Sequence, residues 1–483
     1  MIKIDTKLFF LIAVLLLGGL STASCSSTKI LKLNAVPEHQ TKINGLNYYA
    51  TPSTRKNFTA GKREVKIAFF HGMGWTEKEM TLASDFTDGI YKYYDLGKTR
   101  MPIFSTAGPC EGDRRKRADN KSRNAVGGVK LKLKSAKPYS TDLKDISLVA
   151  ENVGCVDRQI LEPENSDVRF IIYRLFWDNV FWNDLQVYHI GWDDAINLKD
   201  IDENFRVNKD RKKINRVLKD EIVNYGFADA TLYLGGAGEN IRNVVENTIC
   251  IAALDSISND DSIFNAVSST LSIEEECAAP QTNENMPISF VAESLGSRAL
   301  FDVLRAAHFD GSKPILNQIL QQEPEVYLLA NQIPLLGLGN LKPISEEEAL
   351  VQEVVPSKRA KLVAISEVND PLTYEIVPYI HQLASIRELS DNIPQGGSFV
   401  YSEGNPSYIE TNKNLEDEFG FDVVDARMKF AKSLLGFIPF VSDPTDAHTG
   451  HAEQDLIMKL ILCGAAEDKT SGRIIVNSCK QEN

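Results

Sequence analysis

The residue with the clearest chemical meaning in this sequence is a serine placed where a tight turn is expected. Ser294 lies in the segment AESLGS at 292–297, between an apolar run and an amphipathic pattern. We therefore expect a strand, a sharp turn and a helix, with small residues two before and two after the serine. Ala292 and Gly296 meet that demand. The arrangement predicts a nucleophilic serine on a strained turn; a serine that only caps a helix is the alternative.

A carboxylate and two histidines could activate that serine. Asp370 follows the apolar run 361–366, where it could orient an imidazole or simply start a turn before Pro371. His448 and His451 precede the last apolar helical pattern. A general base must reach both the serine and the acid, so we expect it on a loop. We favour His448 as the base because Gly450 follows it, and His451 is the alternative.

The elements that would position these residues alternate between strands and helices. Buried strands are predicted from apolar runs at 65–70, 168–173, 287–292, 326–330 and 361–366. Helical periodicity appears at 239–254, 297–308 and 456–463. This alternation indicates an α/β fold with a mostly parallel central sheet flanked by helices.

Two stretches interrupt the alternation, at about 95–165 and 178–230. The first contains a basic segment at 113–137, which is either a solvated loop or a region attracted to anionic lipid head groups. The second opens with an aromatic cluster, which either packs in the core or forms the wall of a cap or lid. We expect both stretches to be insertions.

The N-terminus has the pattern of a targeting segment. Two lysines precede an apolar run at 8–20, which is short for a membrane span and typical of a signal peptide; a membrane anchor is the alternative. The segment Thr22-Ala23-Ser24-Cys25 resembles a bacterial lipobox. The sequence therefore predicts a signal peptide at 1–24, lipid on Cys25, a tether at 25–60, a folded domain at 61–483, and an exported protein anchored to the membrane.

Cysteine number agrees with export. The sequence has seven cysteines, and six remain if Cys25 carries lipid. We expect three disulfides between neighbours in sequence, although some of the six could instead be free buried thiols. The expected pairs are Cys110–Cys155, Cys250–Cys277 and Cys463–Cys479.

Composition and missing motifs exclude other classes of function. Of 483 residues, 43% are hydrophobic and 25% charged, as in a globular protein, and the net charge of −13 argues against nucleic acid as a partner. Glycines at 235, 236 and 238 follow a possible strand at 231–234, but Ile241 replaces the third glycine of a dinucleotide fingerprint. There is no Walker A or H-E-x-x-H motif.

Taken in order, the HG-x-G segment at 71–74, the x-x-S-x-G segment, the Asp-Pro pair and the histidine resemble the α/β-hydrolase superfamily, in particular bacterial esterases and lipases. The resemblance extends over 65–463. It implies Ser294 as nucleophile, Asp370 as acid, His448 as base and the amides of Met73 and Leu295 as oxyanion donors, with His71 structural.

The resemblance also implies a reaction and its partners. It predicts cleavage of a small-molecule or lipid ester through an acyl-enzyme, without metal or organic cofactor. A hydrolase fold that has lost catalysis and serves as a binding or structural surface lipoprotein is the alternative, because fold alone does not establish activity.

Overall fold

The structure is a computed structural model of the whole chain. It describes residues 28–36, 41–52, 62–72, 79–95, 103–104, 129–131, 154–163, 166–177, 228–235, 237–255, 287–309, 313–337, 359–381, 420–431, 444–468, 470–471 and 473–479. Cys25, Met73, Cys110, Cys277 and the aromatic segment 178–227 lie outside these ranges.

A mixed, mostly parallel sheet forms the centre of the described chain. Its strands follow one another in the order β1-β11-β10-β9-β8-β3-β7-β6-β4, and β2 and β5 pair with β3 and β6. All neighbours from β11 to β7 are parallel, whereas β1 and β6 are antiparallel to their neighbours. The strands are β1 (Lys29–Val36), β2 (Thr51–Pro52), β3 (Arg63–Phe70), β4 (Ile103–Phe104), β5 (Val129–Leu131), β6 (Gly154–Leu161), β7 (Val168–Phe176), β8 (Ile288–Glu293), β9 (Glu325–Leu329), β10 (Lys361–Glu367) and β11 (Asp422–Lys429).

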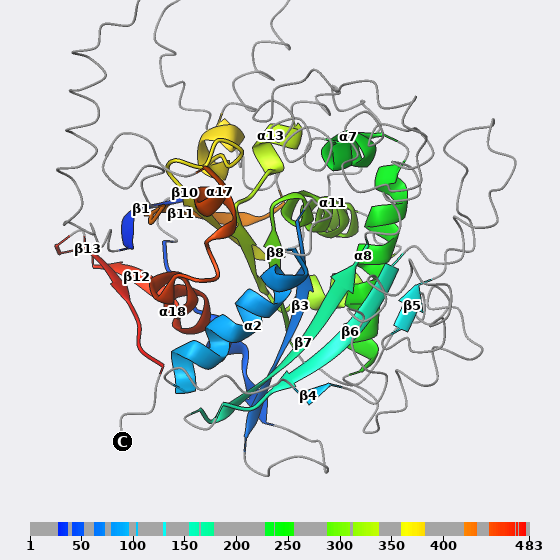
Figure 1. Cartoon of the computed structure of the whole chain (residues 1–483), viewed down its shortest axis with the longest axis horizontal. Coiled ribbons are helices and arrows are strands. Elements are labelled where there is room, and N and C mark those ends of the chain that lie inside the picture. Colours follow the sequence, from blue (N-terminus) through cyan, green and yellow to red (C-terminus); the bar gives the residue numbers. More distant parts are fainter. Residues whose placement is uncertain are drawn as a thin grey trace, which may run out of the picture.

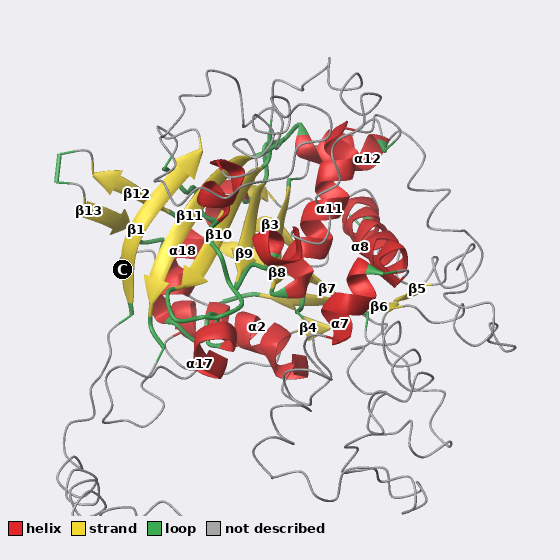
Figure 2. Cartoon of the chain, turned by 90° about the horizontal axis from the view of Figure 1, so that it is seen from above, coloured by secondary structure: helices red, strands yellow, loops and turns green. Residues whose placement is uncertain are grey.

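Helices cover both faces of the sheet (Figures 1 and 2). On one face, α8, α11 and α12 pack against it in a single apolar cluster. On the other, α2, α18 and the 3-10 helix η1 form a second cluster. The helices are η1 (Leu46–Tyr49), α2 (Glu79–Asp95), α7 (Ala228–Leu234), α8 (Ala237–Leu254), α11 (Leu295–Phe309), α12 (Pro314–Leu320), α13 (Ile333–Gly337), α17 (Pro444–Thr449) and α18 (Asp455–Cys463).

Central strands that are buried on both faces explain why the sequence shows continuous apolar runs. Every residue of β8 and of β9 is buried. A strand between two helical layers has no solvated face, so it needs no alternation of polar and apolar residues. The predicted α/β class is therefore confirmed, and the five predicted strands correspond to β3, β7, β8, β9 and β10.

The structure corrects three details of the sequence analysis. The tether expected at 25–60 includes β1, which pairs with β11, and η1, whose Leu46 is fully buried. The stretch 95–165 includes β6, which pairs with β7 over seven positions and belongs to the central sheet. The possible strand at 231–234 is part of helix α7, so the nearby glycines lack the strand that a dinucleotide fingerprint requires.

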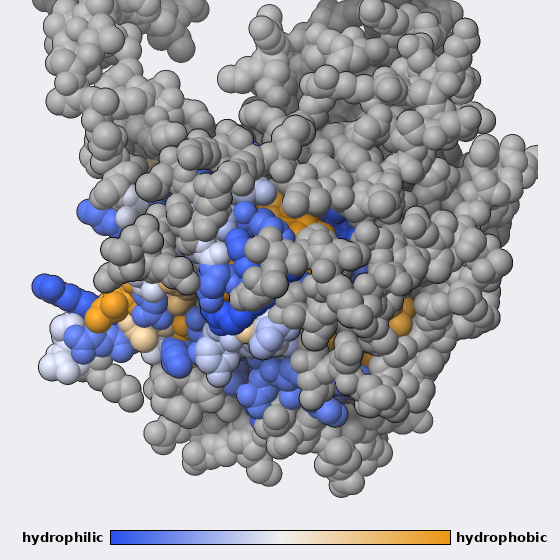
Figure 3. Space-filling model, turned by 90° about the horizontal axis from the view of Figure 1, so that it is seen from below, coloured by the Kyte–Doolittle hydropathy of each residue, from blue (hydrophilic) through white to orange (hydrophobic). Residues whose placement is uncertain are grey.

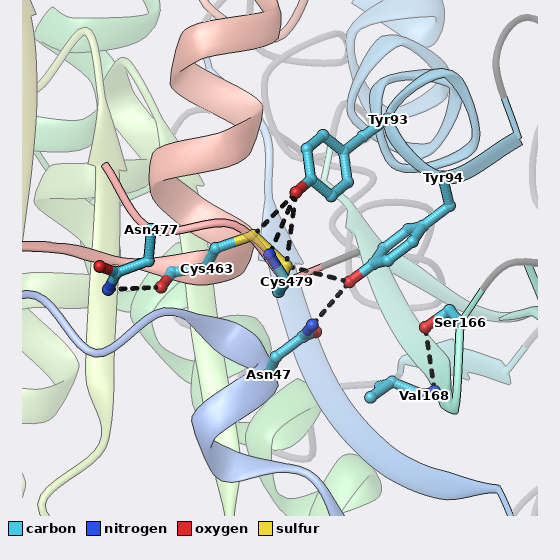
Figure 4. The surroundings of a disulfide bond; sticks show 8 residues. All are labelled: Asn47, Tyr93, Tyr94, Ser166, Val168, Cys463, Asn477 and Cys479. Atoms are coloured by element: carbon cyan, nitrogen blue, oxygen red, sulfur yellow. Dashed lines mark hydrogen bonds between the residues drawn. A yellow bond between two sulfur atoms is a disulfide. The ribbon is translucent and has the colours of Figure 1, made fainter. Parts of the chain in front are cut away.

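A C-terminal hairpin is fastened to α18 by a disulfide. Strands β12 (Ala465–Asp468) and β13 (Arg473–Val476) pair antiparallel, and Cys463 at the end of α18 is bonded to Cys479. The Tyr93 hydroxyl lies 3.2 Å from Cys463 Sγ, which places the bond against the end of α2 (Figure 4). This is one of the three expected pairs; Cys250 is also disulfide-bonded.

One face of the described part of the molecule is mainly polar. Figure 3 shows hydrophilic residues over most of the described part of one face, with small hydrophobic areas between them. Large exposed hydrophobic side chains are scattered along the chain, and they include Leu31, Tyr48, Leu234, Tyr374 and Ile475. Within the ranges described above, no helix is long and apolar enough to cross a membrane.

Candidate active site

Ser294 lies in a strained turn between β8 and α11, at the carboxyl edge of the sheet. Its φ of 51° is in the left-handed region, which non-glycine residues seldom adopt. Two backbone hydrogen bonds hold the turn: Ser294 N donates to Leu329 O at 2.9 Å, and Ser297 N donates to Ser294 O at 3.0 Å. Such strain persists where the surrounding structure enforces it, and it is concentrated at functional sites.

Two glycines allow this turn to approach β3. A Cβ on Gly296 would lie 2.4 Å from His71 O and 2.6 Å from Phe70 O. A Cβ on Gly72 would lie 2.7 Å from the Ser294 Cβ. Neither position tolerates a side chain without backbone movement, so these glycines are steric requirements of the turn. Ser297 adds support, since its hydroxyl donates to Ser294 O and accepts from Gln332 N.

His448 connects Ser294 to Asp370. His448 Nε2 lies 2.9 Å from Ser294 Oγ, and His448 Nδ1 lies 2.8 Å from Asp370 Oδ2. Because a carboxylate only accepts, the ring tautomer that fits both contacts has its proton on Nδ1 and accepts the serine proton at Nε2. The structure thus brings together the three side chains that the sequence analysis singled out.

The element that carries His448 differs from the prediction. We expected a loop, but His448 occupies the last turn of the short helix α17. The turn at 450–453 that follows α17 leads into α18, whose apolar face packs against α2. His448 is therefore held between two helices, and its side chain is 16% exposed.

Asp370 lies on the far side of the His448 imidazole from Ser294. It follows β10, and its side chain is buried. Its carboxylate also accepts from Leu372 N at 2.9 Å and from the Thr373 hydroxyl. Burial alone would raise the pKa of Asp370, but the hydrogen bond and charge of His448, with Thr373 and Leu372, lower it below its usual value. The acid is therefore held ionised.

His451, the alternative base, occupies a different position. Its ring is fully buried and lies edge-on to Phe430, with centroids 4.9 Å apart. His451 Nδ1 donates to the His448 carbonyl oxygen at 3.1 Å. Burial lowers the pKa of His451 to about 4, so the ring is neutral near pH 7. His451 is thus placed to hold the His448 backbone, and it is His448 that contacts Ser294.

A buried carboxylate that the sequence analysis missed joins the ends of two strands. Glu367 accepts from both the amide and the side chain of Asn369, next to Asp370. It also accepts from Phe430 N at 3.2 Å and, more weakly, from Ala431 N at 3.4 Å, at the end of β11. Glu367 therefore fixes the backbone at the start of the loop that carries Asp370. It also fixes the backbone of Phe430, whose ring packs on His451. A charged residue closing an otherwise apolar strand was the available signal.

The oxyanion donors are described in part. Leu295 is the first residue of α11, so its amide is one of the free N–H groups at a helix N-terminus. Met73 lies outside the described residues. His71, two residues before Met73, is buried, and its ring lies tilted against that of Trp177 with centroids 4.6 Å apart. Among the described residues, no group of three His, Cys, Asp or Glu is arranged to hold a metal ion.

Comparison with known proteins adds no relative. No family model, curated protein or solved structure matches the chain.

Proposed function

We propose that this protein is a serine hydrolase of the α/β-hydrolase fold that cleaves carboxylic esters through an acyl-enzyme. The single observation that carries the proposal is the hydrogen-bonded series Ser294 Oγ, His448, Asp370, with contacts of 2.9 and 2.8 Å. These three residues lie far apart in sequence, and each follows or adjoins the carboxyl edge of the sheet. In open α/β sheets this edge is where ligands bind.

The geometry supports a defined sequence of proton transfers. His448 Nε2 takes the proton of Ser294 as Oγ bonds to the carbonyl carbon, and Asp370 stabilises the resulting imidazolium. The carbonyl oxygen becomes negative and accepts from the Leu295 amide, with Met73 as the second proposed donor. His448 then protonates the leaving alcohol as the bond between its oxygen and the carbonyl carbon breaks. Water, deprotonated by His448, attacks the acyl-enzyme; the bond from the carbonyl carbon to Ser294 Oγ breaks, and His448 returns the proton to Oγ as the acid leaves.

The left-handed conformation of Ser294 gives this proposal support that composition alone cannot provide. A serine that merely capped α11 would have extended backbone and would turn its oxygen to its own helix amides. Ser294 has a φ of 51°, and its oxygen points to His448 instead. The strained turn and the two glycines beside it thus serve to present the hydroxyl.

Turnover of a water-soluble aryl ester tests the proposal. We expect the wild-type chain to release the aryl alcohol and Ser294→Ala to lose nearly all of this activity. His451→Asn, which removes the alternative base, should keep most of it. A folded wild-type chain that turns over no ester would contradict the hydrolase proposal and favour a binding or structural role.

We also propose that the chain is exported and anchored by lipid on Cys25, after removal of a signal peptide at 1–24. The lipobox-like segment and the odd number of cysteines support this. Cell fractionation tests it: Cys25→Ser should move the protein out of the membrane fraction. Retention in that fraction would contradict the anchor.

A further inference from the structure

The start of the described domain lies beside the candidate active site. The Thr28 hydroxyl donates to Gln454 Oε1 at 2.7 Å. Gln454 in turn donates from its side chain to Gly450 O and from its backbone to His451 O, both at 3.2 Å. Gly450 and His451 follow His448 almost directly. One side chain therefore links the point where the chain enters the domain to the segment that carries the base.

Strand direction leads to the same placement. β11 runs parallel to β10, and β10 through β9 to β8, so these strands end at one edge of the sheet. β1 is antiparallel to β11, with Lys29 opposite Lys429. The first residues of β1 therefore lie at the carboxyl edge, where Ser294 follows β8 and Asp370 follows β10. Figure 1 shows β1 beside β11.

Four exposed basic residues gather at this corner, and we call them the basic edge: Lys29, Lys32, Arg427 and Lys429. In the register of the two strands, Lys29 lies opposite Lys429 and Lys32 lies opposite Arg427. Residues directly opposite in an antiparallel pair have neighbouring side chains, and like charges there are destabilising. The Arg427–Glu375 pair, at 3.4 Å, is the ion pair that the described residues provide for this edge.

Protection of an edge strand against pairing with another chain does not account for all four charges of the basic edge. Lysines on an edge strand discourage pairing with another chain, which explains Lys29 and Lys32 on β1. β11 is an interior strand between β1 and β10, yet it carries Arg427 and Lys429. In a chain with a net charge of −13, two like-charge pairs next to each other point to an anionic partner.

We propose that the basic edge docks on an anionic lipid surface and turns the Ser294 site towards it, so that the enzyme acts on esters held in the membrane. The proposal rests on the proposed hydrolase function. Three residues separate Thr28 from Cys25 in numbering, a span of at most about 11 Å. A lipid on Cys25 would therefore keep the basic edge close to the head groups, where basic side chains act strongly. The exposed Leu31 lies between Lys29 and Lys32.

Vesicle binding tests the docking surface without the anchor. The parent is the chain from residue 25 onward with Cys25→Ser, without the signal peptide proposed at 1–24, and the vesicles contain phosphatidylcholine with or without phosphatidylglycerol. The parent should bind the anionic vesicles more tightly. Lys32→Gln with Lys429→Gln should weaken that binding roughly 30-fold, which corresponds to about 1 kcal/mol per basic side chain. Lys32→Arg with Lys429→Arg keeps the charge and should bind like the parent.

A control removes two charges from the opposite edge. Lys361 starts β10, and Lys62 directly precedes β3. Strands β3, β8, β9 and β10 are parallel, so both lysines lie at the amino edge of the sheet. Lys62→Gln with Lys361→Gln should bind like the parent. Equal binding by the Lys32→Gln, Lys429→Gln pair and the parent would overturn the proposal, as would an equal loss in the control.

Turnover then separates this proposal from the hydrolase proposal. All of these variants should hydrolyse a water-soluble ester at the parent rate, because none alters Ser294, His448 or Asp370. With an ester lipid in anionic vesicles, the Lys32→Gln, Lys429→Gln pair should lose activity in proportion to binding. Equal turnover of the vesicle ester would contradict docking and leave the hydrolase intact. Absence of turnover on either ester would contradict the hydrolase itself.

Discussion

His448 Nε2 lies 2.9 Å from Ser294 Oγ, although 154 positions of sequence separate the two residues. The contact joins a turn after β8 to a short helix after β11. Strands β8 and β11 end at the same edge of the sheet, so the segments that follow them are neighbours in space. With Asp370 on the far side of the imidazole, the pair has the polarity needed to activate a hydroxyl.

Because these three side chains form one hydrogen-bonded unit, their mutations should not combine multiplicatively. Asp370→Asn together with His448→Ala should cost little more ester turnover than His448→Ala alone. Once the imidazole is gone, the carboxylate has nothing left to orient. Steady-state kinetics of the two single variants and the double variant measure this. Losses that simply multiply would show that Asp370 and His448 act independently.

The turn at Ser294 should be intolerant of a single methyl group at Gly296. A Cβ there would lie 2.4 Å from His71 O, so Gly296→Ala forces the backbone of β3 or α11 to shift. We expect the free energy of unfolding to fall by about 2–3 kcal/mol. Gly235→Ala is the matched control, since a Cβ there would lie 3.4 Å from Thr231 O and 3.5 Å from Leu232 O, at ordinary contact distance. Urea denaturation compares them, and equal stability of the two variants would refute the steric argument.

The sequence predicted the three site residues better than it predicted the elements that hold them in place. Ser294 and Asp370 could be found because each follows an apolar run that forms a buried strand, and His448 because it precedes the apolar run that forms α18. We expected His448 on a loop because a general base must reach both the serine and the acid and because Gly450 follows it. The helix found there, α17, is only six residues long and has no apolar periodicity that would have indicated it. A short helix of this kind is fixed by its neighbours in space, which local patterns do not reveal.

Strands β1 and β11 were missed for a physical reason. β1 has exposed lysines at its start and β11 carries buried Asp425 next to exposed basic residues, so neither reads as an apolar run. Asp425 is buried because its carboxylate accepts from Ile376 N and Val377 N at the start of a helix. Glu367 is likewise buried with backbone amides as partners, those of Phe430 and Ala431, which are 63 and 64 positions away in the sequence. Contacts of this range become visible only in the fold.

Acid should destabilise the protein through His451. Its pKa falls from 6.5 to about 4 on folding because the ring is buried. Between these values the unfolded chain binds more protons than the folded one, so stability is lost as the pH falls from about 6.5 towards 4. The full loss should approach about 3 kcal/mol. His451→Asn can still donate to the His448 carbonyl but does not titrate.

The measurement is the difference in unfolding free energy between wild type and His451→Asn at a series of pH values. Using the difference cancels His308, whose pKa is lowered to about 4 by burial, and Asp425, whose pKa burial raises to about 7. We expect the gap between the two proteins to change in favour of His451→Asn as the pH falls through this window. Parallel pH curves would contradict the buried, neutral ring.

Reduction of the Cys463–Cys479 bond should loosen the C-terminal hairpin. The two cysteines are separated by 16 positions, and a closed loop of this size contributes about 3 kcal/mol of stability. Cys479→Ser should lower the unfolding free energy by roughly that amount while leaving the ester site assembled. Thermal unfolding with and without reductant provides the check. Equal stability of the variant and the oxidised wild type would mean that the bond contributes nothing.

Covalent labelling by a fluorophosphonate tests the central claim most directly. The reagent reacts with a serine activated by a base and surrounded by oxyanion donors, and the phosphonylated product mimics the tetrahedral intermediate. We predict one label on the folded chain, located by peptide mass analysis at Ser294. Ser294→Ala should remove the label, keep the fold and cut ester turnover roughly 10⁴-fold. Labelling at Ser297 instead, or no labelling of a folded chain even with mild detergent present, would contradict Ser294 as the nucleophile.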